Sequence, residues 1–429
     1  YLLTASLRYD GSSRLSEGNK WALFPSAAIA WRITEEDFAK NLDWLSNLKL
    51  RFSYGQAGNT NSVSPYASEG TISGSVYYPF GTSTSVGNLP ANIANPMLTW
   101  ERTSEYNVGL DFGFLNQRIS GNIEYYNRTT NDLLMKRNIP VHLGYSSVTS
   151  NVGSVRNSGF ELQLNTANIM TKNFAWNTTI NLAYNKNEIV SLADEEDLSN
   201  YSIHLQGMRG RYSDKRFIGK PVDTNWTQNT IGVWQLGEEK EAAKYGCVPG
   251  NFKIKDYNND GKLTDDDYII DGKRTPDWTG GMTNMFKIYD FDFSFHMYFQ
   301  AGATQYDRFF ENFALEWNSQ NFNNLRTNYW TPENPSNTMG RPSQMGSRGN
   351  IAYERTDFLK VSYITLGYTL NKRLMSKWGL DNARIYVTVQ NPFILTKFRG
   401  LDPEQPDLTN IGDTDGMTMN ALLGVNISF

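Results

Sequence analysis

The chain has 429 residues, of which 40 are basic and 44 acidic, so its formal net charge is −4. Its mean hydropathy is −0.52 and it has no run of 18 apolar residues, which excludes membrane-spanning helices. The balanced charge without a basic block argues against nucleic acid as a partner, and the single cysteine, Cys247, excludes an internal disulfide framework.

The first residues already show a strand pattern. Apolar and polar side chains alternate there, as they do on a strand whose two faces differ: Leu3, Ala5, Leu7 and Tyr9 against Thr4, Ser6 and Arg8. The pattern starts at Tyr1, with no initiator methionine and no signal peptide before it. We therefore expect residues 1–429 to be the C-terminal portion of a longer protein.

The same alternation recurs about a dozen times along the chain. The clearest segments after the first are 27–33, 48–54, 106–114, 119–125, 160–164, 174–184, 282–286, 291–299, 364–370, 385–389 and 421–429. In the last of these only Leu422 breaks the alternation. Short connections at 116–117, 172–173 and 289–290 join consecutive segments, which is typical of antiparallel hairpins.

These patterns predict an all-β fold, namely a transmembrane antiparallel β-barrel. About ten residues is the length of a tilted strand that crosses a bilayer, and 14% aromatic residues suit the girdles at the two interfaces. A soluble β-sandwich or propeller also shows alternation, but its strands average about five or six residues and a propeller has internal repeats. The longer alternations and the lack of a repeat favour the barrel.

Long connections separate the hairpins. Residues 58–99, 186–277 and 303–356 are rich in Gly, Asn, Ser and Pro, which predicts long extracellular loops opposite short periplasmic turns. Ligand recognition is expected on those loops and on the lumen wall. We count about 13 strands, and because an open edge in lipid leaves backbone groups unsatisfied, further strands are expected, as in a plugged transporter of about 22 strands.

Several ordered motifs resemble one family, the SusC/RagA family of TonB-dependent outer-membrane transporters. They are residues 9–14 followed by Phe24-Pro25-Ser26 and Trp31, residues 48–55 with Gly58-Asn59, residues 151–155 with Gly159-Phe160-Glu161, the run 256–267, Leu366-Gly367-Tyr368, and residues 400–404. Together they extend over the whole chain.

The resemblance implies a C-terminal portion of a 22-stranded barrel in the outer membrane of a Gram-negative bacterium of Bacteroidetes type. It implies import of oligosaccharides or peptides together with a SusD-like lipoprotein, with energy relayed by TonB. The N-terminal plug and the TonB-contacting segment of the family have no counterpart in these residues. The alternatives are a non-transporting barrel that acts as a structural subunit of a larger outer-membrane complex, and a soluble calcium-dependent carbohydrate-binding β-protein.

Residues 256–267 have the spacing of a calcium-binding loop. Oxygen-bearing side chains occupy positions 1, 3, 5, 9 and 12, and Gly261 at position 6 permits the sharp turn. The predicted ligands of a structural Ca²⁺ are Asp256, Asn258, Asp260, the carbonyl of Lys262, Thr264 and Asp267. The alternative is a turn rich in Asn, Asp and Gly that holds no ion.

No catalytic motif is found. His142, His204 and His296 lie on separate segments, and neither a phosphate-binding loop nor a nucleophile elbow is present. We therefore do not expect this chain to be an enzyme.

Overall fold

A single large antiparallel sheet dominates the computed structural model, which describes residues 1–139, 145, 147–315, 327–342, 347–371, 375, 379–405 and 417–429. The sheet contains 12 strands in the order β1-β2-β3-β6-β7-β10-β11-β19-β20-β23-β24-β25. Their bounds are Leu2–Gly11, Trp21–Arg32, Leu45–Asn59, Glu101–Phe114, Ile119–Asn131, Ser154–Met170, Phe174–Ser191, Trp278–Ile288, Phe291–Ala301, Phe358–Thr369, Asn382–Thr396 and Asn420–Ser428.

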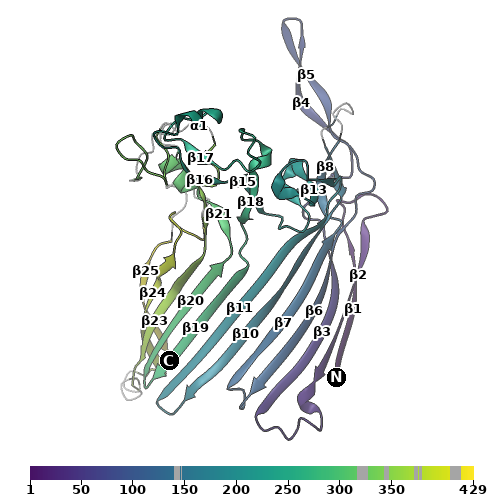
Figure 1. Cartoon of the computed structure of the whole chain (residues 1–429). Helices are drawn as coiled ribbons and strands as arrows, with labels where there is room; N and C mark the ends of the chain where they lie inside the picture. The colour runs from purple at the N-terminus through teal and green to yellow at the C-terminus, as the bar shows by residue number, and fades with distance from the viewer. Residues whose placement is uncertain are drawn as a thin grey trace.

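Neighbouring strands in this order pair antiparallel throughout, and the sheet ends at β1 and at β25. Figure 1 shows the strands tilted and the sheet curved into a wall, with the long connections above it and the short turns below. The prediction of a transmembrane antiparallel β-barrel is therefore confirmed, as is the expected contrast between the two rims.

The large sheet has one strand fewer than the count of about 13 made from the sequence. Short strands of the connections pair in small separate sheets. These strands are β4 Thr71–Phe80, β5 Ser83–Asn92, β8 Leu134–Asn138, β9 Ser147–Asn151, β12 Glu196–Asp197, β13 Arg209–Arg211, β14 Arg216–Phe217, β15 Thr224–Gln228, β16 Thr230–Val233, β17 Phe252–Ile254, β18 Tyr268–Lys273, β21 Thr304–Tyr306 and β22 Tyr353–Arg355.

The helices are few and short, and none of those described is long and apolar enough to cross a membrane. They are η1 Ile33–Glu35, η3 Ile203–Leu205, η4 Tyr212–Asp214, α1 Glu239–Lys244, η5 Asp265–Asp267, α2 Arg308–Phe310 and η6 Glu311–Leu315.

The two faces of the sheet differ as the alternation predicts. Across neighbouring strands, Ile29 pairs with Phe52, Phe52 with Val108, and Val108 with Tyr125, so that apolar side chains form continuous rows on one face. These side chains are exposed: Phe52 is 46% accessible and Tyr125 is 53% accessible. An apolar face of this extent is the surface that meets lipid in a transmembrane barrel.

The last strand behaves in the same way. Val387 pairs with Leu423 and Ile385 with Val425, and both partners in β25 are exposed on the apolar face. Leu422, the residue that breaks the alternation, pairs with Thr388 on the opposite face.

The long connections are folded rather than loose. Residues of the connection between β11 and β19 pack against residues of the connection between β20 and β23 in one shared core. That core comprises Val233, Phe252, Ile254, Phe310, Leu315, Trp330, Met339 and Ala352. A hydrogen bond from the Arg341 backbone N–H to the Gly250 carbonyl, at 2.7 Å, also joins them. These two loops therefore form a single body on the long-loop rim, seen above the sheet in Figure 1.

The hairpin of β4 and β5 stands apart from that body. It extends beyond the rest of the rim in Figure 1, and its side chains Tyr77, Phe80 and Val86 are exposed. No charged residue occurs between Glu69 and Glu101. This hairpin is thus an uncharged and partly apolar projection on the long-loop rim.

The assignment of the two faces predicts opposite outcomes for the same substitution at adjacent positions. Phe52→Arg would place a charge among lipid-facing side chains near the middle of β3 and should lower the free energy of unfolding by about 2–4 kcal/mol. Ser53→Arg, on the polar face, should change it by less than about 1 kcal/mol. Urea unfolding in lipid vesicles measures both, and equal losses would show that the faces are wrongly assigned.

Candidate ligand-binding wall of the lumen

The polar face of the sheet carries several open recesses. One of them, of about 720 Å³, lies over β2, β3, β6 and β7 and is lined by Ser53, Gln56, Glu105, Arg128 and other small or polar residues. A second, of about 500 Å³, includes Lys49, Arg51 and Asp111. Because this face lies opposite the apolar rows, it is the wall of the lumen, and any ligand that passes through the barrel meets these side chains.

A charged network crosses three strands of this wall, β3, β6 and β7. Arg51 on β3 contacts Asp111 on β6 and Glu124 on β7, each at 2.7 Å, and Lys49 contacts Asp111 at 2.6 Å. Gly109 stands between Arg51 and Glu124 in the register, and a Cβ there would lie 2.9 Å from the Arg51 guanidinium. The glycine therefore lets Arg51 lie across β6 and reach a carboxylate two strands away.

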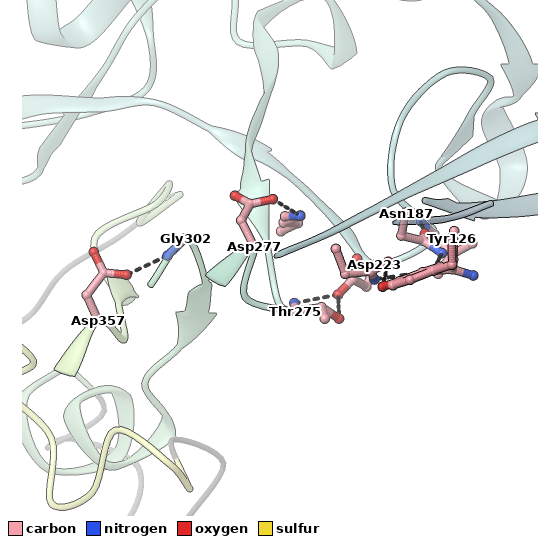
Figure 2. A network of polar contacts seen from close by, with 11 residues as sticks. Tyr126, Asn187, Asp223, Thr275, Asp277, Gly302 and Asp357 are labelled. Atoms are coloured by element: carbon pink, nitrogen blue, oxygen red, sulfur yellow. Dashed lines mark hydrogen bonds and ion pairs between the residues drawn. The ribbon is translucent and has the colours of Figure 1, made fainter. Parts of the chain in front are cut away.

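A second network runs from the wall towards the loops. The Tyr126 hydroxyl donates to the Asn185 side chain at 3.1 Å. The side-chain amides of Asn185 and Asn187 both donate to Oδ1 of Asn157, at 3.3 and 2.9 Å. The Val222 N–H donates to the Asn187 side chain at 3.0 Å. Figure 2 shows Tyr126 and Asn187 among the residues of this network. It ties the wall to the base of the connection between β11 and β19.

Aspartates hold the bases of the long loops at the rim. Asp223 accepts from the Thr275 N–H at 2.6 Å, Asp277 accepts from Lys273 at 2.5 Å, and Asp357 accepts from the Gly302 N–H at 2.7 Å. Figure 2 shows these three carboxylates at successive points of the rim. The loops consequently leave the barrel from defined positions.

The predicted calcium loop is ordered by its own hydrogen bonds. Asp256 accepts from the N–H groups of Asn259 and Gly261 at 2.6 and 2.9 Å, and the two oxygens of the fully buried Asp267 accept from the N–H groups of Tyr257 and Thr264. Gly261 has φ +79°, the left-handed conformation that the sharp turn requires.

The remaining predicted ligands lie on the exposed side of the same loop. Asp260 accepts from the Lys262 N–H at 2.8 Å and from the Asn258 side chain at 3.2 Å. Across the described part of the chain, no three His, Cys, Asp or Glu side chains are grouped so as to hold a metal ion. Thr264 is the N-cap of the 3₁₀ turn η5, and the Asp267 side chain completes the capping box by accepting from the Thr264 N–H.

Burial raises the pKa of Asp256, but the hydrogen bonds from Gly261, Tyr245 and Asn259 outweigh it, so the pKa lies below its ordinary value. This carboxylate is therefore ionised at neutral pH.

Asp307 is a buried acid that lies in no motif of the sequence. Its Oδ1 accepts from the Phe310 N–H at 2.9 Å and caps α2, whereas its Oδ2 has no partner among the described residues, and the residue is fully buried. Burial raises its pKa to about 6; the Phe310 N–H and Arg399 oppose the rise, and Glu354 adds to it. Glu354 and Arg399 form an ion pair beside it.

Two histidines are described, and neither joins a catalytic group. His296 lies on the lumen wall, where its Nδ1 is 2.8 Å from the Thr283 hydroxyl, and His204 lies in a loop with its ring against Tyr257. His142 lies outside the described residues.

Comparisons with known proteins agree with this architecture. Residues 1–391 match the family described as TonB dependent receptor-like, beta-barrel. The TonB-dependent receptor SusC of Bacteroides thetaiotaomicron is 34% identical over all of this chain and 42% of its own length, and a TonB-dependent receptor of Formosa agariphila is 33% identical over all of this chain and 44% of its own length.

Among solved structures, that of the RagAB peptide transporter superposes with a TM-score of 0.77 at 25% identity, over all of this chain and 46% of the matched chain. The chain thus spans less than half the length of each of these relatives.

The raised pKa of Asp307 predicts a pH dependence of the loop body. Between pH 4 and 6 Asp307 keeps its proton in the folded loop but loses it in the unfolded loop. The stability that is fully present below pH 4 should therefore fall as the pH rises through this range. The expected loss is about 3 kcal/mol, at roughly 1.4 kcal/mol per pKa unit. Asp307→Asn preserves the cap but does not titrate, so its stability should change little over this range. Hydrogen exchange at the Phe310 amide, corrected for the intrinsic effect of pH, measures both, and parallel pH profiles would contradict the assignment.

Proposed function

Since the chain belongs to the TonB-dependent receptor-like β-barrel family, we propose that it forms the wall of an outer-membrane importer of SusC type, in a Gram-negative bacterium of the Bacteroidetes. The observation that carries the proposal is the two-sided sheet. Its outer face suits lipid, and its inner face is polar enough to line a passage for hydrophilic nutrients.

The proposed cargo is an oligosaccharide or a peptide, and the proposed energy source is the TonB system. Open recesses that bear amides, hydroxyls and paired charges support hydrophilic cargo of that size. The structural match to the RagAB peptide transporter supports a peptide as cargo, and the oligosaccharide is the class that the resemblance to the SusC/RagA family implies.

We propose a SusD-like lipoprotein as the partner on the long-loop rim. Two features support this location: the loops form one folded body held at the rim by Asp223, Asp277 and Asp357, and the β4–β5 hairpin presents exposed aromatic side chains without charge. Uncharged aromatic surface is enriched in the buried centre of protein interfaces.

Import is tested in the host by deleting the gene and comparing growth and uptake on a panel of oligosaccharides and peptides. We expect the deletion strain to lose uptake of at least one compound, the complemented strain to regain it, and a protonophore to abolish it. A tagged copy extracted in mild detergent should retain a surface lipoprotein. Unchanged uptake over the whole panel, with the tagged barrel held in a larger complex, would favour the structural-subunit alternative.

We also propose that residues 256–267 bind a structural Ca²⁺. The spacing of the oxygen ligands, the φ of Gly261 and the ionised state of Asp256 support it. The side chain of Asp260 would have to turn towards Asp256 on binding, because it now contacts Lys262 and Asn258. The ion would stiffen the loop and take no part in chemistry.

Calorimetric titration of the detergent-solubilised protein with Ca²⁺ tests this site. Asp260→Ala removes a proposed ligand and should weaken binding at least about tenfold, equivalent to roughly 1.4 kcal/mol. Asp266→Ala, at a position that supplies no ligand, should leave binding unchanged. If the unaltered protein releases or absorbs no heat with Ca²⁺, the loop is an ion-free turn.

A further inference from the structure

One stretch of the lumen wall, among the residues that the structure describes, has several polar side chains without recorded partners. It lies over β7, β10, β11 and β19, where an open recess of about 390 Å³ is lined by Glu161, Gln163, Asn122, Asn181 and Thr279. For these five side chains the described part of the structure records no hydrogen bond or ion pair. Elsewhere on the wall, Arg51, Asp111, Glu124 and the Asn157–Asn187 network bind one another.

Glu161 is the charged member of this recess. It pairs in register with Glu124 on β7, so two carboxylates lie directly opposite each other on the same face. Like charges in such a pair destabilise a sheet unless each is neutralised. Arg51 neutralises Glu124 at 2.7 Å, and no described cation is paired with Glu161, which is exposed to the lumen.

The neighbours of Glu161 leave room around it. On β11 its partner in register is Ala183, and Gly281 lies on the same face of β19. Small side chains on that side make the recess, and Tyr298 and His296 on β20 line its far edge. A ligand group that enters would meet the unpaired carboxylate of Glu161, the carboxylate of Glu124 that Arg51 already pairs, several amides and an aromatic ring. This setting suits a cation that also donates hydrogen bonds.

We propose that Glu161 and the recess around it bind a primary ammonium group of the cargo. This rests on the proposed function, in which the lumen is a passage for nutrients. The ammonium can belong to a lysine side chain of a peptide or to an amino sugar of an oligosaccharide, because both present three N–H donors on a compact positive charge. Glu161 is thus assigned as a specificity-determining residue of the lumen wall.

The test uses the full-length protein in detergent and two ammonium probes, tetralysine and a glucosamine tetramer, each with its N-acetylated counterpart as the neutral control. Glu161→Gln should weaken binding of at least one ammonium probe about tenfold at low ionic strength, and Glu161→Asp should retain part of the affinity. Binding of the acetylated probes should not change. The probe that responds identifies the source of the ammonium group.

Glu241→Gln in α1 is the matched control, since it makes the same change in net charge outside the lumen, at a residue paired with Lys244. Equal effects of Glu161→Gln and Glu241→Gln, or equal affinity for charged and acetylated probes, would overturn the proposal. So would a loss of thermal stability in Glu161→Gln with ammonium binding intact, because Glu161 would then serve a partner within the protein. Import of a neutral nutrient by the Glu161→Gln strain would leave the importer function standing whatever the outcome here.

Discussion

Backbone hydrogen bonding in the absence of water is the constraint on which this structure depends. In hydrocarbon an unsatisfied N–H or C=O costs several kcal/mol, so a chain that crosses the bilayer as strands must pair each strand along its length. The 12-stranded antiparallel ladder meets this requirement between neighbours from β1 to β25. With the backbone satisfied by the ladder, side chains are free to differ between the faces, and the alternation of the sequence follows from that freedom.

The constraint extends to polar side chains on the lipid face. Asn284 lies in an otherwise apolar row, yet it is 4% exposed and accepts from the Trp176 indole at 2.9 Å and from the Thr178 hydroxyl at 2.7 Å. Thr178 in turn accepts from Asn168. A polar group is tolerated there because its neighbours bind it and the surrounding side chains cover it.

The lumen face follows a different rule, because it is wet and its side chains can pair across several strands. Glycines on the wall leave space for the long side chains that form these pairs. Gly109 leaves room for Arg51, and at Gly159 a Cβ would lie 2.8 Å from the Tyr126 hydroxyl. Long side chains therefore lie along the wall and bind one another, and the region around Glu161, where they do not, becomes chemically distinct. The body on the long-loop rim adds a second packed core above this wall.

The sequence by itself determined the fold class, the two rims and most strand positions. A strand with one face in lipid needs an apolar side chain at every second position, and this alternation can be recognised in the sequence, as in residues 421–429. It also located the sharp turn within residues 256–267, where Gly261 has the left-handed conformation. Only the tertiary structure decided what depends on register and on packing between distant segments. Glu124 and Glu161 are 37 positions apart and meet because β7 pairs with β10, and Asp307 is buried because loops far apart in sequence close over it. No local pattern encodes those meetings, since each depends on how two strands or two loops align in space.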